Sequence, residues 1–304
     1  MTDVINELIT VRDFLRWAAS RFNEAGLYYG HGTDNAWDEA VALVMHALHL
    51  PLDTATHVLD ARLTLEEKHQ ILELLQKRIV NRIPVPYVTH EAWFAGLSFY
   101  VDERVLIPRS PIAELIETQF QPWVEPDAID TILDLCTGSG CIAITCAKSF
   151  PYAQVDAVDI SADALAVAKL NVSRHEAENQ VHLYQSNLLD GLPEKKYDII
   201  VSNPPYVDAI DMAALPKEYR HEPAIGLEAG KEGLDIVLKI LQQAQRYLNT
   251  HGILVVEVGN SEVALSEKFP EIPFTWIEFQ RGGGGVFMLT QIQLANYRNV
   301  LTTA

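Results

Sequence analysis

Apolar residues in the first 85 positions recur at helical spacing. The clearest set is Ile71, Leu74, Leu75 and Ile79. Thr64 and Glu67, just before this set, form a capping box, in which each side chain accepts a hydrogen bond from an otherwise unpaired backbone amide. A second helix is predicted over 36–49, with Asp34 as its N-cap and Pro51 as its stop. Residues 1–85 are therefore expected to form an N-terminal helical domain.

The pattern changes between residues 86 and 110. Two strand-like runs, Phe94–Val101 and Val105–Ile107, flank the polar residues Asp102-Glu103-Arg104. Apolar and aromatic runs separated by a short polar stretch are typical of a β-hairpin. We therefore expect a β-hairpin linker over 86–110.

From residue 111 to residue 304, strand-like runs alternate with helical patterns. The strand candidates are Thr131–Cys136, Gln154–Asp159, Val181–Gln185, Asp198–Ser202, Gly252–Val258, Thr275–Phe279 and Val286–Thr290. Helical patterns such as Ala162–Ser173 and Gly233–Leu248 separate the first five, which predicts an α/β domain with a parallel, doubly wound sheet. Gln280–Gly285 is too short for a parallel crossover, which needs about a dozen residues, so the final strand should run antiparallel. Its glycines predict a hairpin turn and lack the Lys and Ser/Thr of a phosphate loop.

Composition and charge exclude several classes of function. Of the 304 residues 48% are apolar, but no apolar run approaches the ~20 residues of a membrane span, and the N-terminal residues lack the pattern of a signal peptide. The formal net charge is −18 without any run of lysine or arginine, so we expect no DNA partner. This charge would attract a basic protein, although solubility alone explains it equally well. Neither the three cysteines nor His46 and His49 predict a metal site, and the cysteines indicate a reducing, cytoplasmic location.

A glycine motif, Thr137-Gly138-Ser139-Gly140, lies between a predicted strand and a predicted helix. Its glycines let the backbone turn sharply and approach a ligand closely. Asp159 follows at the end of the next strand, where a carboxylate binds ribose hydroxyls. These features predict an adenosine-containing cofactor and fit both NAD and S-adenosylmethionine. Asp134 favours S-adenosylmethionine, because a carboxylate suits that cofactor's ammonium group and would repel a pyrophosphate.

The tetrapeptide Asn203-Pro204-Pro205-Tyr206 directly follows the fourth predicted strand, at the sheet edge where ligands bind. An amide nitrogen is a poor nucleophile, because its lone pair is delocalised to an extent gauged by the rotation barrier of ~18–20 kcal/mol. The Asn203 side-chain oxygen and the Pro204 carbonyl can accept the two hydrogens of such an NH2 group, and the two prolines restrict the direction of that carbonyl. Tyr206 supplies a flat face for a planar amide or a sulfonium charge. Together with the glycine motif, the tetrapeptide favours methyl transfer to nitrogen over a plain proline-rich turn.

The chain resembles the protein glutamine N5-methyltransferases over nearly its whole length. The similarity is carried by Asn203–Tyr206, Arg82–Tyr87, Val105–Arg109, Tyr219–Pro223 and Gly230–Leu234. The resemblance implies a class I, Rossmann-like methyltransferase sheet of seven strands, the last antiparallel, behind an N-terminal substrate-recognition domain.

The same resemblance implies the residues of the site. Candidate cofactor contacts are Asp134, Cys136, Thr137, Gly138, Ser139, Gly140, Asp159, Asn187, Leu188 and Asn203. Candidate substrate contacts are Asn203, Pro204, Pro205, Tyr206, Arg109 and Glu222, with Asn203, Pro204 and Tyr206 as the catalytic set. Glu222 is expected either to orient Arg109 or the substrate, or to be a solvated loop charge, and Cys136 is also explained as a structural thiol.

Within this family, the chain resembles the branch that acts on ribosomal protein L-three of the large subunit. After Ile107-Pro108-Arg109 it continues with Ser110–Ile116, where the release-factor branch has Pro, an acidic residue, Thr and Glu. Pro273–Phe279 resembles the ribosomal branch too. A ribosomal substrate is basic, which fits the acidic charge of this chain. Methylation of peptide chain release factors remains the alternative.

Asn187 departs from the family pattern, which has Asp there to accept a hydrogen bond from the adenine amino group. An Asn oxygen still accepts, but without the charge. Three other functions stay open at this point. A nucleic-acid amino-methyltransferase would use the same tetrapeptide but needs a basic groove. A cofactor-binding assembly factor would tolerate loss of Asn203, and a nicotinamide oxidoreductase gives the tetrapeptide no role.

Overall fold

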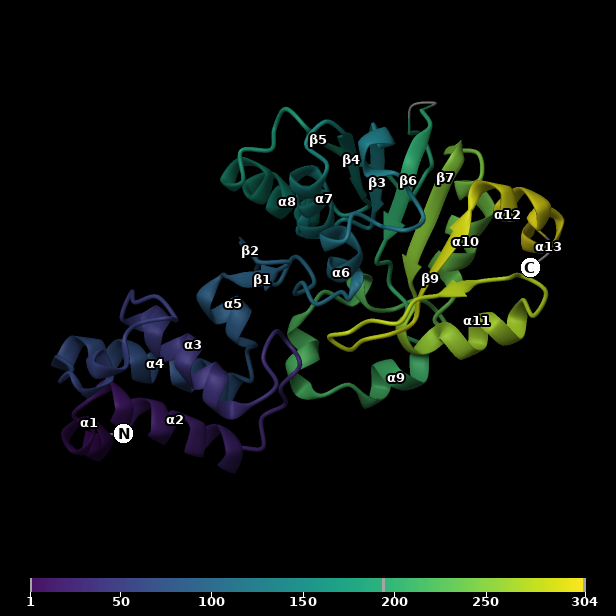
Figure 1. The fold of residues 1–304 in the computed structure, drawn as a ribbon. Coiled ribbons are helices and arrows are strands. Elements are labelled where there is room, and N and C mark those ends of the chain that lie inside the picture. The colour runs from purple at the N-terminus through teal and green to yellow at the C-terminus, as the bar shows by residue number, and fades with distance from the viewer. Residues whose placement is uncertain (1, 193–194, 303–304) are drawn as a thin grey trace. The chain divides into compact units, whose positions relative to one another are not determined.

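The computed structural model describes residues 2–192 and 195–302. The chain divides into two compact units (Figure 1). The helical unit extends to Ala92 and also includes the distant segment Pro216–His221. The sheet unit comprises Trp93–Leu215 and the chain from Glu222 onward. The chain therefore leaves the sheet unit once, contributes six residues to the helical unit and returns.

Five helices build the helical unit. They are α1 (Thr2–Glu7), α2 (Val11–Glu24), α3 (Ala36–Ala47), α4 (Leu65–Asn81) and α5 (Val85–Thr89), with the 3-10 turn η1 (Thr56–Asp60). The predicted capping box of Thr64 and Glu67 is confirmed at the start of α4. The predicted N-cap of α3 was wrong by one position, because the side chain of Asn35, not that of Asp34, accepts from the Asp38 amide. Apolar faces of α2, α3 and α4 form one core.

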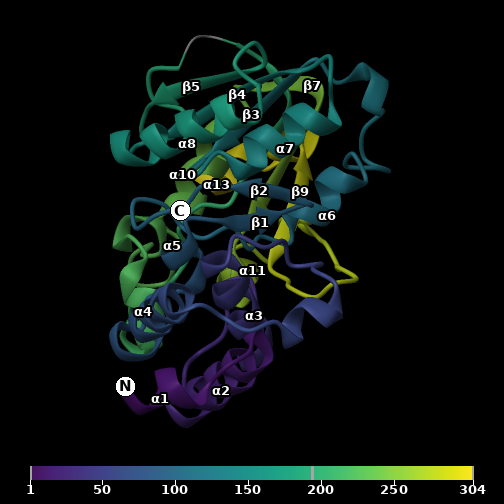
Figure 2. The ribbon, with the colours of Figure 1, turned by 90° about the vertical axis from the view of Figure 1, so that its left-hand side faces the viewer.

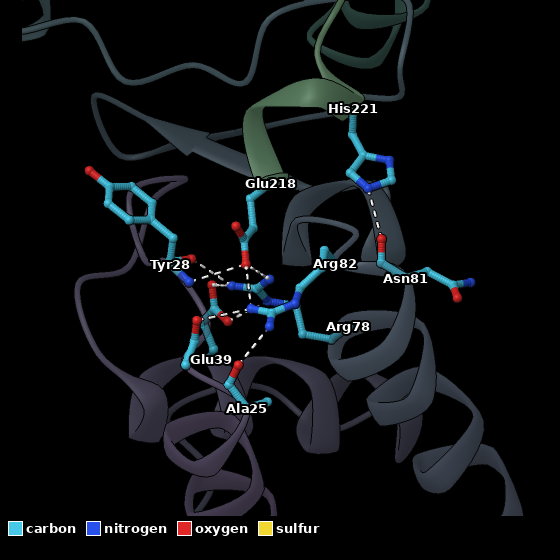
Figure 3. Close-up of polar contacts among 9 residues, drawn as sticks. Ala25, Tyr28, Glu39, Arg78, Asn81, Arg82, Glu218 and His221 are labelled. Atoms are coloured by element: carbon cyan, nitrogen blue, oxygen red, sulfur yellow. Dashed lines mark hydrogen bonds and ion pairs between the residues drawn. The ribbon is translucent and has the colours of Figure 1, made fainter. Parts of the chain in front are cut away.

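A buried ion-pair cluster ties the segment Pro216–His221 into the helical unit (Figure 3). Arg78 on α4 is fully buried and donates to Glu39 on α3 at 2.7 and 3.1 Å. Glu218, in the 3-10 turn η3 (Lys217–His221), accepts from Arg78 at 3.4 Å and from Arg82 at 3.3 Å. The backbone amide of Tyr28 donates to the same Glu218 oxygen at 3.1 Å. Burial alone raises the pKa of Glu218, but this amide and the two guanidinium groups together hold it below its usual range.

The hairpin differs from the sequence prediction. Its strands are β1 (Ala92–Phe94) and β2 (Leu97–Phe99), and they meet at Ala95 and Gly96, both of which have positive φ. Residues 105–107 were predicted as the second strand, but they belong to no strand, and the Val105 amide donates to the Asp102 carbonyl in a turn. The two-residue turn brings the chain back earlier than the polar stretch 102–104 suggested. Ile107 instead gives its backbone amide to the Glu222 carboxylate at 3.1 Å.

The sheet of the second unit has seven strands in the order β5-β4-β3-β6-β7-β9-β8 (Figure 1). Their bounds are β3 (Thr131–Leu135), β4 (Gln154–Asp159), β5 (Val181–Gln185), β6 (Tyr197–Ser202), β7 (Leu248–Glu257), β8 (Thr275–Trp276) and β9 (Val286–Thr290). Strands β3 to β7 pair in parallel, and β9 is antiparallel to β7 and β8, which confirms the predicted final strand. Strand β8 is shorter than predicted. The Ile277 amide still donates to the Val286 carbonyl at 2.9 Å, and further along the amides of Gln280 and Arg281 donate to the Glu114 side chain.

Helices cover both faces of this sheet. The helices are α6 (Ile112–Glu117), α7 (Cys141–Ser149), α8 (Ala162–Arg174), α9 (Ala209–Ala214), α10 (Asp235–Ala244), α11 (Glu262–Lys268), α12 (Gln291–Asn296) and α13 (Arg298–Thr302), with the 3-10 turns η2 (Pro126–Ala128), η4 (Ala224–Gly226) and η5 (Gly259–Ser261). Alternate residues of one strand enter different cores: Ile253 packs with α6 and α7, and Leu254 packs with α10 and α12. Helices α7 and α8 lie over the same face (Figure 2). Because helices cover both faces of the sheet, a ligand is expected to bind at the edge formed by the carboxyl ends of the strands.

Candidate active site

A cavity of about 220 Å³ lies at the carboxyl ends of β3, β4, β5 and β6, entirely within the sheet unit. Its walls come from four segments that are distant in sequence. Two of the four are residues 104–110 and the loop from Cys136 to Ile142. The third consists of the ends of β4 and β5, and the fourth is the chain after β6, with Asn203, Pro205, residues within 223–228 and Ile236. Of the predicted site residues, the lining includes Arg109, Cys136, Thr137, Gly138, Ser139, Asp159, Asn187, Leu188, Asn203 and Pro205. Asp134, Gly140, Pro204, Tyr206 and Glu222 are not part of it.

The glycine loop requires left-handed backbone at three of its residues. Cys136, Gly138 and Gly140 have φ values of 60°, 55° and 80°. A Cβ atom placed on Gly138 would meet no atom within 4 Å, so the loop leaves open space beside the cavity there. A Cβ atom on Gly140 would come within 3.3 Å of the Ala168 side chain, so this glycine serves close packing against α8. Gly140 is also the residue before α7, whose first backbone amides lie below the loop.

Asp159 lies at the end of β4 and lines the cavity. One of its carboxylate oxygens accepts from the Gly138 amide and the other from the Ser161 amide, both at 2.9 Å. Burial raises the pKa of this carboxyl group, and the backbone amides oppose that rise. Each carboxylate oxygen has a second lone pair, so Asp159 can still accept from hydroxyl groups of a ligand.

Asp134 lies under the glycine loop, where it is fully buried. Its Oδ2 accepts from the Thr137 hydroxyl at 2.5 Å and from the Ala143 amide at 3.1 Å. Its Oδ1 has no hydrogen-bond partner among the residues that the structure describes. Burial, the largest cause, raises the pKa of Asp134 to about 7, and the charge of Asp159 adds to the rise. A positive charge beside the unpartnered Oδ1 would favour the ionised form and so oppose this rise.

The ends of β5 and β6 complete the far wall. The Asn187 side-chain amide donates to Asp190 at 3.4 Å, which leaves the Asn187 oxygen as an acceptor. The Ser202 hydroxyl donates to the Leu135 carbonyl at 2.8 Å and so fixes the end of β6 against β3. Directly after it, Asn203 and Pro205 line the cavity, and Pro204 is buried behind them.

Residues 104–110 form a strap across the cavity, and Glu222 holds this strap. Its carboxylate accepts two bonds from Arg109, at 2.5 and 2.9 Å, and a third from the Ile107 amide at 3.1 Å. Glu222 was expected either to orient Arg109 or the substrate, or to be a solvated loop charge. Because it is buried and bonded to Arg109, the geometry matches the orienting role.

Sequence reasoning missed Glu257, Ser110 and Glu228. Glu228 lines the cavity, and Ser110 both lines it and donates to Glu257. For Glu257 the signal was present, because an acidic residue directly follows the apolar run Ile253–Val256 at the end of a strand, as Asp159 follows Ala157 and Val158. Ser110 and Glu228 carry no comparable signal, because only the fold brings them to the cavity.

In the described part of the chain, no cluster of His, Cys, Asp and Glu has the arrangement of a metal site. Among the described helices, none combines the length and the apolar character that a bilayer span requires.

Comparison with known proteins identifies two domain families. Residues 13–89 match the PrmC N-terminal domain, and residues 120–216 match the methyltransferase small domain. A solved methyltransferase from Pyrococcus furiosus is 20% identical, with a TM-score of 0.47 over 64% of this chain and 89% of that one.

Two relatives are similar along almost the whole chain. A ribosomal protein uL3 glutamine methyltransferase from Francisella tularensis is 48% identical, over 98% of this chain and 95% of that protein. Another, from Neisseria gonorrhoeae, is 52% identical, over 95% of this chain and 96% of that protein. The resemblance drawn from the sequence is thereby confirmed, and the chain belongs to the glutamine methyltransferase family represented by these two enzymes.

Proposed function

We propose that this protein transfers a methyl group from S-adenosyl-L-methionine to the side-chain amide nitrogen of a glutamine in ribosomal protein uL3. The observation that carries the proposal is the position of Asn203-Pro204-Pro205-Tyr206 at the end of β6, with Asn203 in the wall of the cavity. The names of the two relatives supply the substrate. The three cysteines are free, in keeping with a cytoplasmic enzyme.

The residues around the cavity fit S-adenosylmethionine, which supplies an electrophilic methyl group when bound. Asp159 would accept from the ribose hydroxyls, and Asn187 with Leu188 would meet the adenine. The backbone from Cys136 to Gly140 would follow the chain of the cofactor across the open space above Gly138. The unpartnered Oδ1 of Asp134 provides the negative charge that an ammonium group requires from below the loop.

The protein's own part in the reaction is to hold the glutamine amide. In our proposal, the Asn203 oxygen and the Pro204 carbonyl accept the two N–H bonds, which aims the nitrogen lone pair along the direction of transfer. Tyr206 limits where the planar amide can lie. Arg109, fixed by Glu222, lies in the strap on the same cavity and would contact the substrate. Positioning of this kind contributes at most ~7–11 kcal/mol to the lowering of a barrier.

We further propose that the helical unit recognises the protein substrate, since none of its residues lines the cofactor cavity. Its six-residue segment Pro216–His221 directly precedes Glu222, which holds the strap. In our proposal, a continuous segment of the chain therefore connects the unit that recognises the substrate to the residue that holds the strap.

The test is mass spectrometry of uL3 and of release factors from cells with and without this gene. We expect one glutamine of uL3 to carry an added methyl group only when the gene is present, and the release factors to be unchanged. Methylated release factors with unmethylated uL3 would overturn the choice of substrate. In vitro, uL3 with Glu in place of the target Gln should accept no methyl group, because a carboxylate offers no donor to Asn203 and Pro204. Sites built around a hydrogen bond reject such analogues by about 10⁴–10⁵.

A further inference from the structure

Glu257 is a buried carboxylate next to the catalytic tetrapeptide. It is the last residue of β7, which pairs in parallel with β6, the strand that ends at Ser202. Its side chain is only 5% exposed, and it does not line the cofactor cavity. A buried charge needs several kcal/mol of compensation, and an apolar residue of similar size is often as stable. Packing alone therefore gives no reason for a carboxylate at this position.

The Glu257 carboxylate joins two walls of the site. Its Oε1 accepts from the Tyr206 hydroxyl at 2.8 Å, and its Oε2 accepts from the Ser110 hydroxyl at 2.5 Å. Tyr206 belongs to the loop after β6, and Ser110 belongs to the strap held by Glu222. Only a carboxylate offers both of its oxygens as acceptors to two hydroxyl donors, whereas the amide of glutamine offers one oxygen.

Tyr206 is fixed at its other end as well. Its backbone carbonyl accepts from the Ser261 hydroxyl at 2.9 Å. A Cβ atom on Gly259 would come within 2.5 Å of the Tyr206 ring, and a Cβ atom on Gly233 would come within 2.2 Å of the Tyr206 carbonyl. The ring and its backbone thus lie in a fitted slot, and Glu257 holds the hydroxyl end.

The glycine run before β9 supports the same slot. The Gly285 carbonyl accepts from the Val258 amide at 2.6 Å, and a Cβ atom on Gly285 would come within 2.2 Å of the Gly259 carbonyl. Because Gly285 has no side chain, the connection between β8 and β9 can pack closely against the turn that follows Glu257. The hairpin turn predicted from the sequence has this second use.

We propose that Glu257 is a positioning residue for methyl transfer, which holds the Tyr206 ring and the Ser110 strap in the arrangement that receives the glutamine amide. This inference rests on the proposed function of the site. Glu257 does not line the cofactor cavity, and it acts on the substrate only through Tyr206 and Ser110.

The main test compares Glu257→Gln, Tyr206→Phe and the double variant. We expect each single variant to lower kcat ten- to a hundredfold, which corresponds to about 1.4–2.7 kcal/mol and matches hydrogen bonds to a charged group. The cofactor dissociation constant, measured by calorimetry, should stay within about twofold, because neither residue lines the cavity. The double variant should be no slower than the slower single one, since both changes break the same link.

The pH profile separates positioning from a merely structural role. The groups that face Glu257 are the hydroxyls of Ser110 and Tyr206 and the charge of Arg109. Burial raises the pKa of Glu257 and these groups oppose the rise, so the carboxylate becomes protonated at a higher pH than an ordinary glutamate. Protonation removes one of its acceptor positions, so kcat at saturating cofactor should fall as the pH falls through that range. In Glu257→Gln this fall should disappear, whereas the exposed control Glu267→Gln should keep it.

A readout without substrate keeps the test independent of the proposed function. The NMR signal of the Tyr206 ring, assigned by its loss in Tyr206→Phe, should shift in Glu257→Gln and stay unchanged in Glu267→Gln. A wild-type kcat for either single variant, multiplied losses in the double variant or an unmoved Tyr206 signal would each overturn the role of Glu257. If the wild type methylated no glutamine while the Tyr206 signal responded, the proposed function would fail and the positioning contact would stand.

Discussion

At the scale of single residues, the site depends on a few side chains whose acceptor atoms are directed by the backbone. Asn203 is the one predicted catalytic side chain that lines the cavity. Replacement of Asn203 by Ala removes one of the two proposed acceptors for the amide hydrogens. We expect turnover to fall by roughly 10²–10³, by analogy with the loss of one oxyanion-hole donor.

Asn203→Asp is the sharper variant, because it keeps an acceptor oxygen and adds a charge. It should retain partial activity. Both variants are measured by single-turnover transfer of a labelled methyl group to purified uL3. An Asn203→Ala enzyme as fast as the wild type would remove Asn203 from the mechanism.

Asp159 should dominate the affinity for the cofactor. Its carboxylate lies in the cavity wall and can accept charge-assisted hydrogen bonds from two ribose hydroxyls. Asp159→Ala should weaken S-adenosylmethionine binding by roughly 1.5–3 kcal/mol in a calorimetric titration. Asp163→Ala removes an exposed carboxylate in the first turn of α8 and serves as the control, with unchanged affinity. Equal affinities of the two variants would place Asp159 outside the ribose site.

Asp134 predicts a link between cofactor binding and protonation. Its pKa in the folded protein is raised to about 7 from 3.8, so the fold favours the protonated form. This shift lowers the stability of the fold progressively as the pH rises from 3.8 to about 7, above which the carboxyl group is ionised in both states. A positive ammonium group beside Oδ1 would lower this pKa. Binding near pH 7 should therefore release protons, and affinity should rise between pH 6 and pH 8.

Calorimetry in buffers with different ionisation enthalpies measures this proton release directly. Asp134→Asn should abolish both the release and the pH dependence of the affinity. If proton release persisted in Asp134→Asn, another group would have to be its source.

At the scale of helices and strands, the elements that could be predicted are those fixed by local patterns. Strands β4, β5 and β9 have the bounds predicted from the sequence, because short runs rich in β-branched and aromatic residues between turn signals mark strands. The boundaries that were wrong depended on choices between neighbours, such as Asp34 against Asn35 as N-cap. The hairpin was misplaced because a two-residue turn at Ala95-Gly96 competed with a more polar stretch nearby.

Contacts between segments that are distant along the chain could not be predicted from the sequence. Glu218 lies 140 residues from its partner Arg78, and no local pattern marks either as half of a pair. For the same reason Ser110 and Glu257, 147 residues apart, were not connected. Asn203, Asp159 and the glycine loop could be named because strand ends share one edge of the sheet.

The ion-pair cluster of the helical unit should be a major source of its stability. Arg78→Met leaves Glu39 and Glu218 buried with a positive charge missing, and breaking a buried pair in this way typically costs about 3–5 kcal/mol. We expect a clearly lower denaturant midpoint for this variant. Arg12→Met breaks the exposed pair with Asp60 and should leave the midpoint nearly unchanged. Equal midpoints for the two variants would show that the cluster contributes little.

At the scale of the whole molecule, the course of the chain joins the helical unit, which we propose recognises the substrate, to the active site. Pro216–His221 belongs to the helical unit, and the next residue, Glu222, holds the strap that borders the cofactor cavity. A protein substrate bound by the helical unit would therefore act on a segment that continues directly into the active site. The net charge of −18 would add a long-range component, because it would attract a basic ribosomal protein before any contact forms.

This electrostatic attraction predicts that salt affects encounter with the substrate and leaves the chemistry unaffected. The Debye screening length falls from about 10 Å at 0.1 M salt to about 3 Å at 1 M salt, so charges attract over a shorter distance at high salt. Raising the salt should therefore lower kcat/KM for intact uL3 through a higher KM, while kcat at saturating substrate stays nearly constant. A short neutral peptide that contains the target glutamine serves as the control, because it has little charge to be attracted. Its kcat/KM should hardly change over the same range. If peptide and intact protein lost kcat/KM equally, salt would be acting on the active site itself, and the negative charge of this enzyme would serve solubility alone.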